Sequence, residues 1–153
     1  MAAYRSFFRV LAMTALLFAV AIHPDRIMAA DANTSPIGVW LSVGDSGGKG
    51  HIQIYRCGAK LCGKLIHSNT PEARDVKNPD EALRSRKLIG SDLLWGFEPD
   101  GENLWTGGRI YDPTSGKTWK CQFSVGNAGN KLNVRGYWGI ALFGQTRTWT
   151  RVR

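Results

Sequence analysis

Short runs of alternating apolar and polar residues, each ended by glycine, asparagine, aspartate or proline, constrain this chain more than any other feature. Such runs predict β-strands, and the 18 glycines favour tight turns between them. About eight strands with short connections favour an antiparallel up-and-down barrel, because closure leaves no exposed edge. A two-sheet sandwich is the alternative. The strands are expected over residues 38–43, 51–56, 63–67, 88–97, 104–111, 118–125, 132–138 with a bend at Gly139 before 140–143, and 146–152.

Residues 68–87 form the one long segment without a strand pattern. Asn78, Pro79 and Glu81 stand in the order of a helix N-cap, a first helical residue and a third helical residue. We therefore expect one or two turns of helix in this segment of an otherwise all-β domain.

The start of the chain has the pattern of a secretory signal peptide. Arg5 and Arg9 precede an apolar run over residues 10–22, and this run of 13 residues is shorter than a bilayer-spanning helix. Ala29 and Ala30 are small residues that suit a cleavage site. A membrane-anchoring helix or a wrongly assigned start codon is the alternative.

Cleavage at this site predicts a signal peptide over residues 1–30 and a single domain over residues 31–153, with a mature N-terminus at Asp31 or Ala30. The protein is then periplasmic or secreted, with no stable membrane span. The full chain has a net charge of +8, and the mature part has 17 basic and 11 acidic residues. These charges are scattered and export argues against a nucleic-acid partner, so an anionic envelope component, or no partner, is expected.

The cysteines fit an oxidising compartment. Cys57 and Cys62 lie between two expected strands, and a four-residue loop would place them directly across a hairpin, which favours a disulfide. A zinc site that also uses His51 and His67 is the weaker interpretation, because the spacing is unusual for zinc. Cys121 lies on the apolar side of its strand and is expected to be a buried, inert thiol.

The Gly-Val-Trp sequence at residues 38–40 resembles the Gly-x-Trp signature of lipocalins. In that superfamily a basic side chain from the last strand covers the tryptophan ring. The resemblance therefore implies that Trp40 is a structural anchor and that Arg151 or Arg147 covers it by a cation–π contact.

A second resemblance extends over nearly all of the expected domain. The motifs that carry it are, in order, residues 61–64 (Leu-Cys-Gly-Lys), 78–79 (Asn-Pro), 107–113 (Gly-Gly-Arg-Ile-Tyr-Asp-Pro), 134–137 (Val-Arg-Gly-Tyr) and 148–151 (Thr-Trp-Thr-Arg). With these motifs the chain resembles an uncharacterised exported bacterial family, domain of unknown function 2147. The resemblance implies a lipocalin-like barrel of the calycin superfamily, and it supplies no catalytic residues to assign.

Two Arg/Tyr pairs suggest a ligand site. Arg109 with Tyr111, and Arg135 with Tyr137, repeat one pattern on two expected strands. If they face into the barrel, each arginine can bind an anionic head group and each tyrosine can form apolar wall with a polar tip. They can equally lie on the outer face, where arginine stems cover aromatic rings. The expected site residues are Arg109, Tyr111, Arg135, Tyr137, Trp95 and Trp105.

The sequence gives no support for a catalytic site. Residues 44–48 (Gly-Asp-Ser-Gly-Gly) have the Gly-x-Ser-x-Gly spacing, but they form the glycine-rich turn that ends the first expected strand and do not lead into a helix, as a nucleophile elbow does. Asp92, Glu98 and Asp112, the acids that could form a glycosidase pair, are typical turn residues. The sequence favours a non-catalytic binding protein for a small apolar or amphiphilic ligand, with no cofactor or metal. The alternative is a solid barrel that interacts through its basic surface or through residues 68–87.

Overall fold

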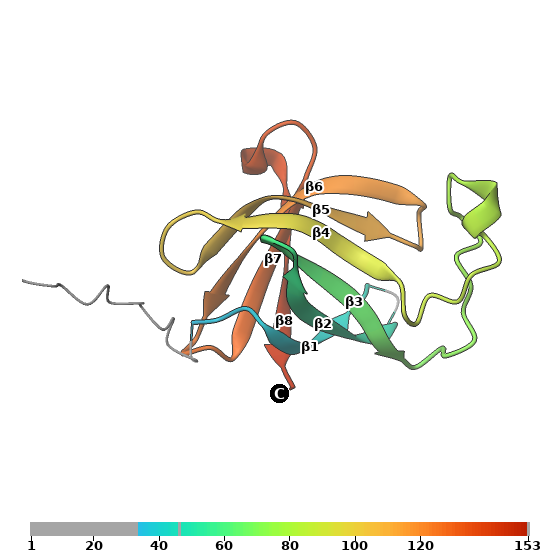
Figure 1. The fold of residues 1–153 in the computed structure, drawn as a ribbon, viewed down its shortest axis with the longest axis horizontal. Helices are drawn as coiled ribbons and strands as arrows, with labels where there is room; N and C mark the ends of the chain where they lie inside the picture. The colour runs from blue at the N-terminus through green and yellow to red at the C-terminus, as the bar shows by residue number, and fades with distance from the viewer. Residues whose placement is uncertain (1–33, 46, 153) are drawn as a thin grey trace, which may run out of the picture.

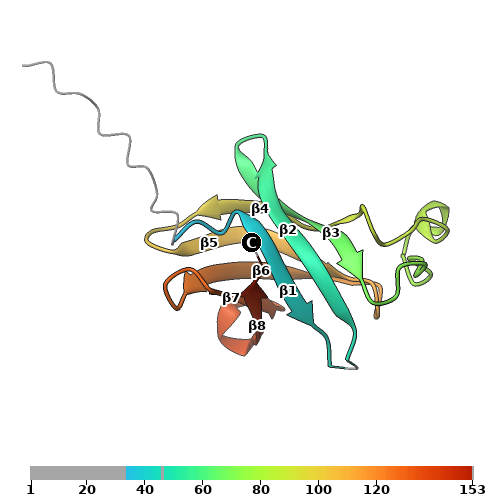
Figure 2. The same cartoon turned by 90° about the horizontal axis from the view of Figure 1, so that it is seen from below.

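The computed structural model describes residues 34–45 and 47–152, which form a closed barrel of eight antiparallel strands. Each strand pairs with the next along the chain, and β1 closes on β8 through Trp40–Arg151 and Leu41–Thr150 (Figures 1 and 2). This confirms the up-and-down barrel and excludes the sandwich. The strands are β1 (Gly38–Val43), β2 (Lys49–Cys57), β3 (Lys60–Ser68), β4 (Asp92–Pro99), β5 (Leu104–Asp112), β6 (Lys117–Gly126), β7 (Lys131–Tyr137) and β8 (Gln145–Arg151).

The expected signal peptide over residues 1–30, with its cleavage site, lies outside the described residues. Across the part of the chain that is described, no helix has the length and apolar character needed to cross a membrane.

The interior of the barrel is filled by side chains. Phe97 and Phe123 meet with ring centroids 4.4 Å apart, and Trp105 stacks on Phe123 at 5.6 Å. A Cβ atom on Gly108 would lie 2.4 Å from the Phe97 ring, so glycine is required at that position. The other buried core residues include Trp40, Ile52, Ile54, Leu61, Leu65, Leu94, Cys121, Val125, Leu132, Val134 and Trp149.

The β2–β3 hairpin is tighter than expected. Its turn contains two residues, Gly58 and Ala59, instead of four, and a φ of 69° at Gly58 suits a glycine-led hairpin turn. Cys57 pairs with Lys60 and Cys62 pairs with Tyr55, so the two cysteines are diagonal rather than directly opposite. Their Cα atoms lie 5.8 Å apart and the predicted disulfide is present.

Residues 69–91 connect β3 to β4 and stand beyond the ends of these strands (Figure 1). They contain one 3-10 turn, η1 (Glu81–Leu83). The expected cap at Asn78 is wrong: the Asp80 side chain accepts from the Ala82 N–H, while the Asn78 side chain accepts from the Asp80 N–H. The expected strand start at residue 88 is also wrong, because β4 begins at Asp92.

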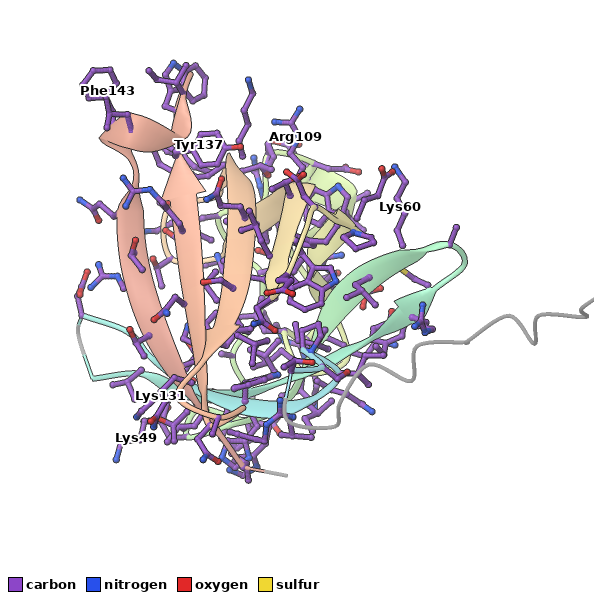
Figure 3. All side chains as sticks on the ribbon, turned by 90° about the vertical axis from the view of Figure 1, so that its left-hand side faces the viewer. Lys49, Lys60, Arg109, Lys131, Tyr137 and Phe143 are labelled. Atoms are coloured by element: carbon purple, nitrogen blue, oxygen red, sulfur yellow. A yellow bond between two sulfur atoms is a disulfide. The ribbon has the colours of Figure 1, made fainter. Side chains whose placement is uncertain are left out.

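The last connection, between β7 and β8, differs from the expectation of a strand over residues 140–143. It contains the 3-10 turn η2 (Ala141–Phe143), whose large side chains face solvent. We call the end of the barrel that carries this loop the upper end. Figure 3 shows Arg109, Tyr137 and Phe143 at this end and Lys131 at the opposite, lower end.

Candidate functional site

Strand pairing places both Arg/Tyr pairs on the outer side of the barrel wall. Along β5, Ile110 packs against the core, so its neighbours Arg109 and Tyr111 point outward. Along β7, Val134 is buried in the core, so Arg135 points outward, and Tyr137 follows on the same side. The two pairs differ in their contacts, because Tyr111 is covered by residues 69–91 and Arg135 binds the β7–β8 loop.

Tyr111 is buried although it points outward, because residues 69–91 cover it. Its hydroxyl donates to Asp75 Oδ1 at 2.5 Å, and the fully buried Asp75 carboxylate also accepts from Asn78 and from Arg86. Burial alone would raise the pKa of Asp75, but these hydrogen bonds outweigh it and hold the pKa below the usual value. Burial, together with the hydrogen bond to Asp75, raises the pKa of Tyr111 to about 12.

Arg135 supports the β7–β8 loop. Its guanidinium donates to the carbonyl oxygens of Ala141 and Leu142, at 2.6 and 3.0 Å, and to the Thr146 hydroxyl at 2.9 Å. The donors of the Arg135 guanidinium are thus occupied by groups of the protein itself, and they hold the backbone of the loop in place.

The two tryptophans expected in a ligand wall lie apart. Trp105 is half-buried and belongs to the core through its stacking on Phe123. Trp95 is 39% exposed and lies on the outer face of β4, opposite Arg109 in the strand pairing.

Arg109 and Tyr137 do come together, in a pocket at the upper end of the barrel. Arg109, Lys120 and Tyr137 form one row across β5, β6 and β7. With Thr118, Trp138 and Gly139 they line an open pocket of about 320 Å³.

A second, larger pocket of about 550 Å³ adjoins the first and shares Thr118 and Trp138 with it. Its walls are mainly apolar, and Lys117 and Trp119 complete them. The Trp119 and Trp138 rings meet edge to face, with centroids 6.2 Å apart. We call the two together the upper pocket; it is large enough for one small ligand.

The upper pocket is electropositive. Arg109, Lys117 and Lys120 line it, and within residues 34–45 and 47–152 none of the three forms an ion pair. Lys120 Nζ donates to the Gly139 carbonyl at 3.3 Å, and Lys117 Nζ lies 5.9 Å from the centre of the Trp119 ring. The pocket therefore combines apolar aromatic walls with cations, as an amphiphile with an anionic head group requires.

Sequence reasoning missed six residues of the upper pocket: Lys117, Thr118, Trp119, Lys120, Trp138 and Gly139. Alternation along β6 places Trp119 on the same inner side as Cys121, which indicated a core residue. One sequence signal could have pointed to this pocket. The alternating pattern of β7 stops at Trp138 and Gly139, and apolar residues continue beyond them.

The lower end of the barrel is closed by the lipocalin-like anchor. Trp40 is fully buried and its indole N–H donates to the Pro36 carbonyl at 2.8 Å. Arg151, rather than Arg147, covers the ring, with its guanidinium carbon 4.1 Å from the ring centre. Arg147 instead forms an ion pair with Asp45 in the β1–β2 turn.

Cys121 is a free, fully buried thiol, as expected. Burial raises its pKa to about 12, which disfavours the reactive thiolate. His51 and His67 face each other across β2 and β3 with ring centroids 5.0 Å apart. Among the described residues no three His, Cys, Asp or Glu side chains gather in a way that could hold a metal ion.

Comparison with known proteins supports this fold. A solved structure, protein HP1028 from the human pathogen Helicobacter pylori, described as belonging to the lipocalin family, superposes with a TM-score of 0.71 at 21% sequence identity. The match covers 78% of this chain and 84% of that one. No curated protein matches the chain. The model of a family of uncharacterized proteins conserved in bacteria, DUF2147, matches residues 38–151, the whole barrel, and the chain therefore belongs to that family.

Proposed function

We propose that this protein is an exported, non-catalytic barrel that binds one small amphiphile with an anionic head group in the upper pocket. The observation that carries the proposal is that an apolar Trp119–Trp138 wall lies beside Lys117 in a pocket of about 550 Å³, with Arg109 and Lys120 in the adjoining pocket. Pockets of several hundred Å³ are typical of small-molecule sites.

The packed core supports a ligand at the upper end of the barrel. Phe97, Trp105 and Phe123 pack against one another in the interior, which favours the upper pocket over a position along the barrel axis. The acyl or aromatic part of the ligand would lie against Trp119 and Trp138. Its anionic group would meet Lys117, or Arg109 and Lys120 in the adjoining part of the pocket.

The residues that the sequence predicts as ligand-binding have two different roles in this proposal. Arg109 and Tyr137 belong to the proposed site directly, and Trp95 borders Arg109 on the outer face. We assign Tyr111, Arg135 and Trp105 a supporting role, because each is held by other groups of the protein.

Export is part of this proposal. The basic residues, apolar run and small residues of positions 1–30 support passage to the periplasm or outside, and the Cys57–Cys62 disulfide is compatible with an oxidising compartment.

The filled core also favours one alternative, a solid barrel that contacts an envelope component through its basic surface. Native mass spectrometry of the protein isolated from its own cell envelope separates the two. We expect one added small mass that organic extraction removes. A spectrum with the bare polypeptide alone, from several gentle preparations, would favour the alternative.

A further inference from the structure

The β7–β8 loop exposes an unusual concentration of apolar surface. Residues 138–143, which we call the apolar loop, contain four large hydrophobic side chains that solvent contacts over most of their area. Monomeric proteins rarely gather exposed apolar residues in this way without a use for them. The exposed fractions are 77% for Trp138, 59% for Ile140, 75% for Leu142 and 79% for Phe143.

The backbone of the apolar loop is held in place while its side chains project outward. Arg135 binds the carbonyls of Ala141 and Leu142, and the Phe143 N–H donates to the Ile140 carbonyl. A Cβ atom on Gly144 would lie 2.7 Å from the Gly136 carbonyl oxygen, so the chain packs closely where the loop returns to the barrel. Satisfied backbone groups are a condition for entering an apolar medium.

Cations surround the base of the apolar loop. Arg109, Lys117 and Lys120 lie beside Trp138 in the upper pocket, and Lys120 contacts the loop at Gly139. Asp112 lies opposite Lys117 in the register of β5 and β6. Its carboxylate oxygens already accept hydrogen bonds from Thr114 and Ser115. Figure 3 shows the Phe143 ring projecting beyond the end of the barrel, with Arg109 set back at the same end.

We propose that the apolar loop docks the barrel on the surface of an anionic lipid bilayer. Ile140, Leu142 and Phe143 enter the boundary between head groups and acyl chains, and Trp138 lies at the level of the head groups. The cations at the base of the loop contact lipid phosphates.

The composition of this surface favours a bilayer over a protein partner. Its apolar residues form a projecting tip rather than a groove. A tryptophan beside aliphatic residues, with lysine and arginine behind them, is the pattern of proteins that bind the membrane interface. Basic residues next to such a tip add affinity for anionic lipids. This inference goes beyond the proposed function, because a soluble ligand in the upper pocket would not require Ile140, Leu142 or Phe143, none of which lines that pocket.

Co-sedimentation with vesicles of phosphatidylglycerol and phosphatidylcholine tests the inference. All proteins are prepared with the same N-terminus, and pure phosphatidylcholine vesicles serve as the neutral reference. The test variant is Leu142→Ser/Phe143→Ser. The matched control is Val43→Ser/Val152→Ser, which removes two other exposed apolar side chains.

We expect binding to the anionic vesicles that weakens with salt and is much weaker on neutral vesicles. The test variant should lose roughly tenfold or more of its partitioning, because each large side chain contributes substantially when buried. The control should bind like wild type. The inference is overturned if the wild-type protein does not bind anionic vesicles, or if the two double variants bind them equally. It is also overturned if the loop instead drives self-association of the protein that the test variant abolishes.

The same variants keep this inference separate from the proposed function. Leu142 and Phe143 do not line the upper pocket. The test variant should therefore still bind a soluble amphiphilic probe. Loss of vesicle binding with retained probe binding supports docking by the loop, whereas probe binding that fails in every protein refutes the proposed function alone.

Discussion

The guanidinium carbon of Arg151 lies 4.1 Å from the centre of the Trp40 ring, at the lower end of the barrel. Arg151 also donates to the carbonyls of Ser35, Ile37 and Gly129, which belong to the segment before β1 and to the β6–β7 turn. One side chain thus joins the last strand, the segment that leads into the first strand and a turn, and it covers the fully buried Trp40 ring. This contact closes the barrel where β1 and β8 share only two residue pairs.

Removing either partner should destabilise the barrel. Trp40→Ala should lower the free energy of unfolding by about 3–5 kcal/mol, because it leaves a large cavity. Arg151→Ala should lower it by about 2 kcal/mol or more, since several charge-assisted hydrogen bonds are lost. Denaturant unfolding measures both. Arg147→Ala is the matched control and should change stability by less than about 1 kcal/mol, because its ion pair is exposed. Equal effects for the two arginines would contradict the anchor.

Acid should weaken the attachment of residues 69–91 through Asp75. Its pKa is lower in the folded protein than in the unfolded chain, so its contribution is present above about pH 4 and is lost as the pH falls through the lower, folded pKa. The free energy of unfolding should therefore fall more steeply below pH 4 in wild type than in Asp75→Asn. Asp45→Asn, which alters an exposed ion pair, should retain the wild-type dependence. Parallel curves for Asp75→Asn and wild type would exclude this role.

The cysteines should behave as one bridge and one inert thiol. Peptide mapping should recover Cys57 linked to Cys62, and Cys121 should react with thiol reagents only after unfolding. The double variant Cys57→Ser/Cys62→Ser should lose roughly 2 kcal/mol or less, because the bridge closes a short loop. A native protein whose Cys121 reacts at the rate of a free thiol would show that the barrel opens.

The N-terminus of the protein in its own envelope fraction should be Asp31 or Ala30. The reason is the basic, apolar and small-residue order of the first 30 residues. N-terminal sequencing or intact-mass measurement decides the point. A protein that starts at Met1 in that fraction would favour a membrane-anchoring helix.

The barrel follows from local sequence rules, because alternation and turn residues act within each strand and each hairpin. The disulfide was predictable for the same reason, although the two-residue turn shifted its geometry. Alternation also placed Arg109 and Tyr111 correctly on one face. Alternation could not show that Tyr111 is buried while Arg109 stays exposed. That difference comes from Asp75, which lies 36 residues before Tyr111 in the chain and accepts a hydrogen bond from its hydroxyl.

The upper pocket was less accessible to sequence reasoning. Trp119 follows the inward pattern of a core residue, and only its place near the start of β6 leaves it partly exposed beside Trp138. Residues 140–143 have the apolar character of a strand, and periodicity cannot distinguish four such residues from a turn whose side chains face solvent. Both assignments depend on where strands end, which is decided by the packing of the whole barrel.

Titration with a fluorescent fatty-acid probe tests the central claim, that the upper pocket binds one anionic amphiphile. Wild type should bind the probe saturably with one site per chain. Trp119→Ala should weaken binding by roughly tenfold or more through the lost apolar contact. Lys117→Glu, an exposed change that leaves the core intact, should weaken it through charge repulsion. Circular dichroism verifies that each variant is folded.

The control in this titration is Leu142→Ser/Phe143→Ser, which alters two residues of the apolar loop that do not line the pocket and should bind the probe like wild type. The account predicts saturable binding that is weakened by the Trp119 and Lys117 variants alone. A folded wild-type protein that binds no probe, or binding that neither pocket variant weakens, would contradict it.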